Sequence, residues 1–182
     1  GNSEYVSSQL NSGVTQIFSN PNAFAALKDD GSVVTWGDNY YGGNSNNVSD
    51  QLSSGVTQIF STSHAFAALK DDGSVVTWGS GLFGGNSSAV ASELQQDVVD
   101  VVASTSAFAA RRSDGSVVVW GDQSAGGDAT SVQGLIQGGV AKVYANDSAF
   151  SALKTDGTVV AWGDEDSGGS TRFAGGGDIV GI

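Results

Sequence analysis

Few side chains in this sequence could carry chemistry, and those few lie in loops between apolar runs. The chain has 182 residues, with one histidine, His64, and no cysteine. Imidazole can act as a general base near neutral pH, but His64 has no thiol to activate and no nucleophile-elbow motif accompanies it. The same counts exclude disulfides, thiolate metal sites and zinc sites built on several histidines. The sequence therefore predicts no catalytic residue and a protein that is not an enzyme.

The consecutive residues Asp164, Glu165 and Asp166 form an acidic cluster. Carboxylate oxygens are ligands for calcium, but this spacing matches no EF-hand loop and the other units of the chain lack it. The Gly-Gly runs lack the Lys-Ser/Thr of a phosphate-binding loop. We expect a solvated acidic patch, no metal site and no cofactor.

Two sets of variable loops are the candidates for binding. The first set covers residues 38–41, 80–83, 122–125 and 164–167, and the second covers 19–22, 61–64, 103–106 and 145–148. Loops on a rigid scaffold commonly carry recognition, and aromatic or large apolar residues anchor partners well. The candidate binding residues are Asn39, Tyr40, Tyr41, Leu82, Phe83, Gln123, Glu165 and Asp166 in the first set and His64 in the second. The alternative is that these side chains fold back over the edge of their own sheet.

A repeated unit organises the elements that must position these loops. The four tryptophans, Trp36, Trp78, Trp120 and Trp162, follow one another at equal intervals, which indicates internal repetition. We interpret residues 1–182 as one repeat domain, with a partial unit at 1–13 and full units at 14–55, 56–97, 98–139 and 140–181.

The ends of the chain are complementary parts of one unit. The partial unit at 1–13, GNSEYVSSQLNSG, repeats the last third of a full unit, GNSNNVSDQLSSG, whereas the fourth unit reads STRFAGGGD at 170–178. The N-terminal third is therefore predicted to supply the segment that the fourth unit lacks. The alternative is an arbitrary chain boundary in a longer array.

Each unit is predicted to form three strands. In the first unit these are Val14–Phe18, Ala23–Leu27 and Ser32–Trp36, rich in β-branched and aromatic residues. Asp30-Gly31 between the last two predicts a hairpin with a primed turn, because glycine tolerates positive φ. Both faces of these strands are apolar, so each sheet must pack between its neighbours, and one tryptophan per unit is predicted to fill the gap.

Charge and hydropathy limit the partners. Nineteen acidic residues against seven basic ones give a formal net charge of −12, which disfavours nucleic acid. No apolar run approaches the roughly 18 residues of a membrane span, so no membrane insertion is expected. The remaining partners are a protein or a surface glycan.

The sequence AFAALKDDGSVVTWG at 23–37 contains an A-L-K-x-D-G turn and a V-x-x-W-G strand end. A glycine follows five residues after the last of these, at Gly42, Gly84, Gly126 and Gly168. These elements resemble the regulator-of-chromosome-condensation repeat family, and most of all its short-repeat bacterial type, such as the propeller-type β-lactamase inhibitory protein. The resemblance implies a β-propeller with one antiparallel blade per unit. The chain departs from the family in having Gly-Gly at 42–43 in place of Gly-Gln and only four full units.

The predicted fold is therefore all-β, a propeller-like array of four 42-residue antiparallel blades. We expect a ring closed by exchange of chain ends, either within one chain or in a homo-oligomer such as an eight-bladed dimer. An open fragment of a longer array is the other interpretation.

The predicted function is a noncatalytic protein-binding or adhesion module of a larger secreted or cell-surface protein. The alternative is a propeller that inhibits another protein, such as an enzyme. Nucleotide exchange on a GTPase with chromatin binding is implied by the family name and disfavoured by charge and length.

Overall fold

The computed structural model describes residues 3–170, 173–174 and 178–179. Its core is four antiparallel sheets of three strands, each in the order of the sequence. Their strands are β1 (Val14–Ser19), β2 (Ala23–Lys28), β3 (Val33–Gly37), β4 (Val56–Ser61), β5 (Ala65–Lys70), β6 (Val75–Gly79), β7 (Val98–Ala103), β8 (Ala107–Arg112), β9 (Val117–Gly121), β10 (Val140–Ala145), β11 (Ala149–Lys154) and β12 (Val159–Gly163). The prediction of an all-β array of four antiparallel blades is confirmed, and we call the sheets blades 1 to 4.

The connections between blades contain short turns of 3₁₀ helix. After the third strand of each blade comes one turn, in η2 (Asn39–Tyr41), η4 (Gly81–Phe83), η6 (Gln123–Ala125) and η8 (Glu165–Ser167). The linkers that lie before blades 1 to 4 contain η1 (Glu4–Gln9), η3 (Asn46–Val48), η5 (Ser88–Glu93), and η7 (Thr130–Val132) with α1 (Gln133–Ile136). Two short strands, β13 (Phe173–Ala174) and β14 (Asp178–Ile179), follow blade 4.

The hairpin at Asp30-Gly31 was predicted in the right place but with the wrong turn. A primed Asp-Gly turn needs positive φ at both central residues, and here Gly31 has φ +75° while Asp30 is not among the residues of positive φ. Instead, residues 29–32 connect β2 to β3, with the Gly31 N–H donating to the Lys28 carbonyl at 3.0 Å. Asp30 keeps an ordinary conformation because its carboxylate accepts hydrogen bonds from Ser32.

Each blade has two apolar faces, which the strand register defines. Cross-strand partners share a face, so the pairs Ile17 with Ala26 and Phe24 with Trp36 place these side chains together on one face of blade 1. We call this the leading face, because in blades 2 to 4 it packs against the preceding blade. The opposite, trailing face of blade 1 carries Phe18, Ala25, Leu27 and Val33.

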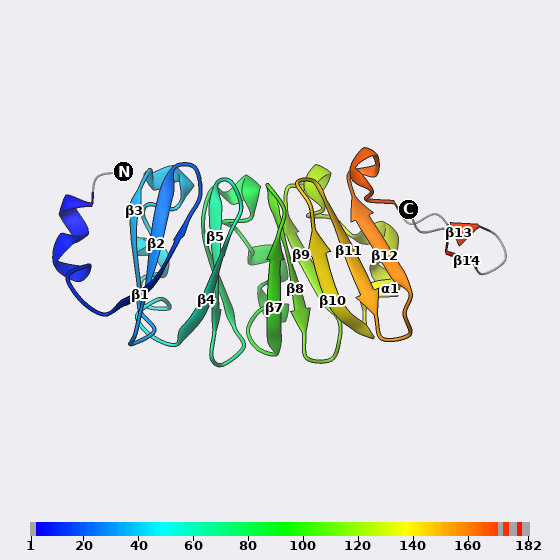
Figure 1. Cartoon of the computed structure of the whole chain (residues 1–182), viewed down its shortest axis with the longest axis horizontal. Helices are drawn as coiled ribbons and strands as arrows, with labels where there is room; N and C mark the ends of the chain where they lie inside the picture. Colours follow the sequence, from blue (N-terminus) through cyan, green and yellow to red (C-terminus); the bar gives the residue numbers. More distant parts are fainter. Residues whose placement is uncertain (1–2, 171–172, 175–177, 180–182) are drawn as a thin grey trace.

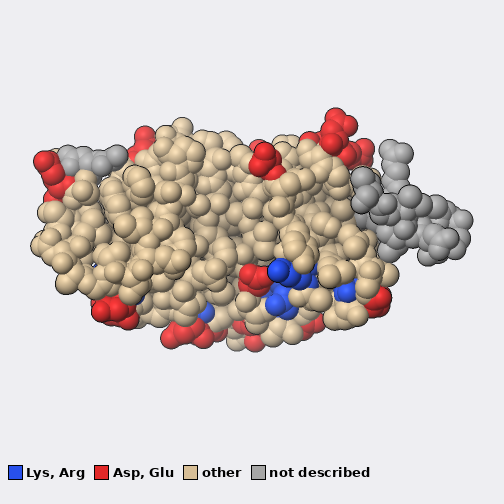
Figure 2. Space-filling view, viewed as in Figure 1, with Lys and Arg blue, Asp and Glu red and all other residues tan. Residues whose placement is uncertain are grey.

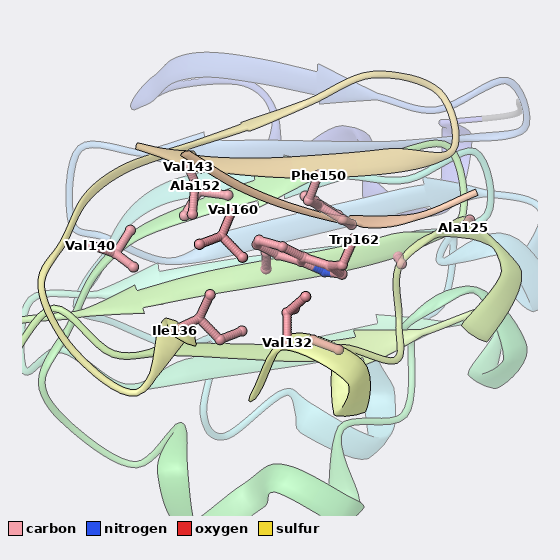
Figure 3. Packing of buried hydrophobic residues seen from close by; sticks show 12 residues of the cluster. Ala125, Val132, Ile136, Val140, Val143, Phe150, Ala152, Val160 and Trp162 are labelled. Carbon is pink, nitrogen blue, oxygen red and sulfur yellow. The ribbon is translucent and has the colours of Figure 1, made fainter. Parts of the chain in front are cut away.

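The core of the protein lies in three junctions between blades. At each junction the trailing face of one blade meets the linker and the leading face of the next, as in the cluster of Ala25, Leu27, Leu52, Ile59, Phe66, Val76 and Trp78. Corresponding clusters join blades 2 and 3 and blades 3 and 4. Figure 3 shows the last of them, with Trp162 between Phe150 above it and Val132 and Ile136 below. Small alanines on the trailing faces let the sheets approach closely.

Tryptophan anchors each junction, as the sequence predicted. In blade 2 the Trp78 indole N–H donates to the carbonyl of Gly42 in the preceding blade at 3.0 Å, and Trp120 and Trp162 do the same to Gly84 and Gly126. Each indole also stacks on the phenylalanine opposite it, with ring centroids 5.3–5.5 Å apart. Trp36 stacks on Phe24 in the same way, but the described residues place no blade before it.

The four blades stand in a row, with blade 1 at one end and blade 4 at the other (Figure 1). Within the described residues the leading face of blade 1 and the trailing face of blade 4 therefore do not meet. The predicted exchange of chain ends involves residues 170–182, which mostly lie outside the described part of the chain. Ring closure stays a prediction.

Many acidic side chains gather where the turns of the blades lie. Figure 2 shows most Asp and Glu side chains along one long edge of the row, with a second group above blade 4. The long edge is where the turns between the second and third strands of each blade lie, at the bottom of Figure 1. In the described segments no helix is long and apolar enough to cross a membrane.

Candidate functional site

The first set of candidate loops is built on a capped 3₁₀ turn. In blade 1 the carboxylate of Asp38 accepts a hydrogen bond from the Tyr40 N–H at 2.9 Å, and Gly42 ends the turn in the left-handed conformation at φ +101°. Asp122 and Asp164 cap the corresponding turns of blades 3 and 4. Side-chain capping of the free N–H groups explains why Asp recurs directly after Trp-Gly. The turn holds its first two residues outward and its third residue against the blade.

The second set of loops is tied to the first by one polar side chain per blade. The Asn20 amide donates to the Tyr41 carbonyl at 2.8 Å, and Asn146 donates to Ser167 in the same way. In the middle blades the hydroxyl groups of Thr62 and Ser104 donate to Phe83 and Ala125. The two sets of loops therefore lie side by side at one edge of each blade. These tethers, at residues 20, 62, 104 and 146, were not predicted, although polar residues at a fixed place in every unit were a visible signal.

Blades 1 and 2 bring five of the predicted residues together in an aromatic and apolar group. The His64 ring lies between Tyr41 of blade 1, at 4.7 Å between centroids, and Phe83 of its own blade, at 4.4 Å. Tyr40 meets Tyr41 edge-on at 5.2 Å. Tyr40 is 60% exposed and Leu82 is 72% exposed. We call Tyr40, Tyr41, His64, Leu82 and Phe83 the rim cluster.

Some side chains of the rim cluster fold back over the edge of the sheet, and others are exposed and available for binding. Tyr41 and Phe83 do fold back, since they are half-buried and enclose His64, whose Nδ1 is buried with no hydrogen-bond partner among the described atoms. Tyr40 and Leu82 point into solvent from the same turns. The packed turns thus fix the backbone positions from which two large exposed side chains project, and Tyr40 also contacts the Tyr41 ring. A site fixed in advance in this way lowers the ordering cost of binding.

The same edge of blades 3 and 4 has a different character. Gln123, Glu165 and Asp166 are exposed and polar, as predicted, and Asn39 in blade 1 is exposed beside the rim cluster. The third turn residue is Ala125 in blade 3, where it is buried, and Ser167 in blade 4. The structure therefore does not bring Gln123, Glu165 and Asp166 into one group with the rim cluster.

A shallow polar depression lies between the second loops of all four blades. It is lined by residues 19–21, 61–63, 103–105 and 145–147, most of them serine, threonine and asparagine. Neighbouring loops are joined by backbone hydrogen bonds, from Ser63 to Thr105 and from Thr105 to Asp147. Its floor is therefore fixed, and its hydroxyl and amide groups suit a polar surface.

Several carboxylates of this protein accept hydrogen bonds within the turns in which they lie. Asp164 accepts hydrogen bonds from the Asp166 N–H and the Ser167 hydroxyl, and in the described ranges no three His, Asp or Glu side chains gather into a group that could hold a metal ion. At the opposite edge Asp30, Asp72, Asp114 and Asp156 each accept a hydroxyl hydrogen bond from the Ser or Thr two residues later, at 2.6–2.7 Å. This side-chain hydrogen bond, together with one from the backbone, lowers the pKa of each of these carboxyls.

Comparison with known families identifies one of the repeats. Residues 14–42 match the model of the regulator of chromosome condensation (RCC1) repeat, so the predicted resemblance is confirmed on blade 1. No protein with a curated description matches the chain.

Solved structures confirm the propeller-like fold. Prp20p from Saccharomyces cerevisiae is 17% identical with a TM-score of 0.58, and the match covers 85% of this chain and 45% of that one. The CRINKLY WD40 ectodomain of the Arabidopsis thaliana receptor kinase ACR4 is 17% identical with a TM-score of 0.53, covering 84% and 51%. Human WBSCR16 is 18% identical with a TM-score of 0.51, covering 87% and 49%. The chain thus spans about half the length of the propellers it matches.

Proposed function

We propose that the chain is a noncatalytic protein-binding module that uses the rim cluster as its anchor. The observation that carries this proposal is the pair of exposed side chains, Tyr40 and Leu82, on two neighbouring blades whose adjacent turn residues, Tyr41 and Phe83, both pack against His64. Interface anchors are typically aromatic or large apolar groups surrounded by polar residues that exclude water. The polar depression, which adjoins the rim cluster through the tethers at Asn20 and Thr62, supplies such surroundings.

The fold supports a recognition role. Structural work on Prp20p describes its binding to Gsp1p and histones, and another of its structures contains Kap60. Because Prp20p shares the fold but little of the sequence, the class of function is proposed for this chain and those partners are not. A further match is a receptor-kinase ectodomain, which supports the proposed location on a cell surface or in a secreted protein.

Two further parts of the proposal concern catalysis and assembly. His64 is enclosed by two aromatic rings, and its Nδ1 has no hydrogen-bond partner within the described part of the chain, which supports a packing role over that of a general base. We also propose that the chain is a homo-oligomer.

The anchor is tested by a pair of double variants at corresponding positions. Tyr40→Ala/Leu82→Ala removes the exposed anchors, and Ser124→Ala/Asp166→Ala changes the same turn positions in blades 3 and 4. Proteins captured from cell-surface and medium fractions by the parent chain are purified and titrated against all three forms by calorimetry. We expect the first variant to weaken binding by roughly 30-fold or more, since hot-spot truncations cost about 2 kcal/mol or more. Equal affinities for the two variants would refute the anchor.

A further inference from the structure

The two ends of the array are the separated halves of one more blade junction. A junction needs a trailing face, a linker and a leading face, and blades 1 and 4 leave one face each without a neighbouring blade among the described residues. Every residue of these faces has counterparts, one repeat unit apart along the chain, inside the three complete junctions. The internal junctions therefore show what each end is built to receive.

The leading face of blade 1 is an internal surface without its cover. Ile17 is 59% exposed, whereas its counterparts Ile59, Val101 and Val143 are each 2% exposed. Phe24 and Trp36 are half-buried, whereas the corresponding rings of the other blades are buried. The Trp36 indole makes no hydrogen bond to a glycine carbonyl, within the described residues, of the kind that Trp78, Trp120 and Trp162 make.

Blade 4 presents the other half of the junction. Tyr144 is 50% exposed on its trailing face, where Phe18, Phe60 and Val102 of the other blades are half-buried. The glycine that ends the 3₁₀ turn after each blade shows the difference most clearly. A side chain on Gly42, Gly84 or Gly126 would lie within 2.4–2.6 Å of the phenylalanine of the next blade, whereas one on Gly168 would meet no described atom within 4 Å. Gly168 thus borders a place that no described residue fills and that a phenylalanine and a tryptophan fill at the internal junctions.

We propose that a second copy of this chain fills both ends, so that two chains joined head to tail form a closed ring of eight blades. Blade 4 of each copy then contacts blade 1 of the other, with Phe24 against Gly168 and Ile17 inside the junction. A head-to-tail contact of this kind forms a ring when its rotation closes. The inference rests on the proposed oligomer and is independent of the rim cluster.

The repeat also assigns the hydrogen bonds across the contact. Inside the chain, the first strand of each following blade donates from Val56, Val98 or Val140 to the carbonyl of Gly31, Gly73 or Gly115. The corresponding pair between copies is the Val14 N–H and the Gly157 carbonyl. The corresponding indole bond runs from Trp36 of one copy to Gly168 of the other. A side chain built on Gly157 also meets no described atom within 4 Å.

The N-terminal partial unit completes the junction. Its helix η1 contacts β3 as η3 contacts β6 and η5 contacts β9, so it already occupies the place of a linker before blade 1. Leu10 is half-buried there, whereas its counterparts Leu52, Leu94 and Ile136 are each 2% exposed. A blade placed against η1 would bury Leu10 as the internal linkers are buried.

Two copies agree with the lengths of the propellers that the chain matches. The chain spans 45% of Prp20p, 51% of the CRINKLY ectodomain and 49% of WBSCR16. Two copies of these residues therefore supply about the length of one such propeller.

Engineered disulfides test the contact, because the chain has no cysteine of its own. At the first junction the Ser61 hydroxyl donates to the Ser19 carbonyl at 3.0 Å, which brings these two residues together. The intramolecular calibrator is therefore Ser19→Cys/Ser61→Cys. The corresponding pair between copies is Ser19 with Ala145, so the test variant is Ser19→Cys/Ala145→Cys. Ser19→Cys alone is the control for head-to-head contact.

We expect the test variant to oxidise to a covalent dimer on a nonreducing denaturing gel, while Ser19→Cys alone stays monomeric. Light scattering on the parent chain should give twice the 18.3 kDa chain mass. A ladder of higher oligomers or an internally linked monomer on the gel would overturn the two-chain ring. So would a parent chain that has the mass of one chain at every concentration in light scattering. Tyr40→Ala/Leu82→Ala should leave the mass unchanged, so loss of partner binding and loss of the ring are separable.

Discussion

The inner junctions and the outer ends of this array use corresponding repeat positions, and among the described residues they differ most in what lies against them. Phe108 is fully buried against Gly84 of the blade before it, whereas its counterpart Phe24 is half-buried, with no blade before it in the described part of the chain. The comparison separates what the repeat sequence encodes in each blade from what a neighbour adds. Blades are encoded locally, and their stability and exposure depend on contact with the next blade.

The largest expected effect is on the buried phenylalanines. In an Ile17→Asp background, which keeps the chain monomeric under our proposal, Phe108→Ala should lower the free energy of unfolding by about 3–5 kcal/mol, because it leaves a cavity in a packed junction. Phe24→Ala should lower it by less than half as much. Urea denaturation followed by circular dichroism measures both. Similar losses at the two sites would mean that the end face is as well covered as the junction.

A smaller difference is expected between two loop glycines. Gly84 and Gly168 have φ of +96° and +88°, so alanine at either should suffer similar backbone strain, about 1–2 kcal/mol. Gly84→Ala must also displace Phe108, whose Cδ2 would lie 2.5 Å from the new Cβ, and overpacking of this kind costs about 1–3 kcal/mol more. In the monomeric background, thermal melting should therefore rank Gly84→Ala below Gly168→Ala.

Dimerisation of the two chains, in contrast to folding stability, should be most sensitive to the substitution at Gly168. Because Gly168 faces Phe24 of the second copy in the proposed ring, Gly168→Ala should abolish the dimer in the parent background. Sedimentation velocity measures this directly. A Gly168→Ala chain that still dimerises would contradict the assigned contact while leaving the stability comparison intact.

The smallest expected effect concerns the pKa values of the turn aspartates, which are lowered in the same way in an inner blade and in a terminal blade. Hydrogen bonds from Ser74 and Thr158 lower the pKa of Asp72 and Asp156 in the same way, although one turn lies in blade 2 and the other in terminal blade 4. A carboxyl whose pKa is lowered by folding stabilises the fold above its unfolded pKa and loses that contribution as the pH falls through the folded pKa. Stability should therefore decline below about pH 4, from the ordinary Asp value.

Carboxyl NMR titration of the parent chain, Ser74→Ala and Thr158→Ala tests this equivalence. Each substitution should raise the pKa of its own aspartate toward the ordinary value and leave the other unchanged. A shift at one blade only would show that these turns depend on their neighbours, against the local origin that we assign to them.

Much of the fold was predictable because it depends on spacing. The regular recurrence of tryptophan, the apolar runs and the Asp-Gly pairs located all twelve strands of the four blades to within a residue or two. The turn type was not predicted correctly, because Asp-Gly suits both primed turns and the connection seen here, in which only Gly31 has positive φ. The Asp-Gly-Ser sequence itself carries the signal for this connection, because an Asp side chain commonly accepts a hydrogen bond from the N–H two residues later.

The candidate site was predictable residue by residue but not as a group. Sequence variation between units pointed to Tyr40, Leu82 and His64, yet nothing in the sequence placed His64 between rings of two different blades. That contact depends on how closely adjacent blades approach, which the alanines of the trailing faces set. The missed tethers, such as Asn20 to Tyr41, show the same limit, because they join segments 21 residues apart.

The central claim is that Trp36 at the free end has the same partner in the assembled protein as the three internal tryptophans. Hydrogen exchange of the four indole N–H groups, followed by ¹⁵N NMR and assigned with Trp36→Phe, measures this directly. We predict four slowly exchanging indoles in the parent chain, and three slow with one fast in Gly168→Ala. A dimeric parent chain whose Trp36 indole exchanges as fast as an exposed one would contradict the claim.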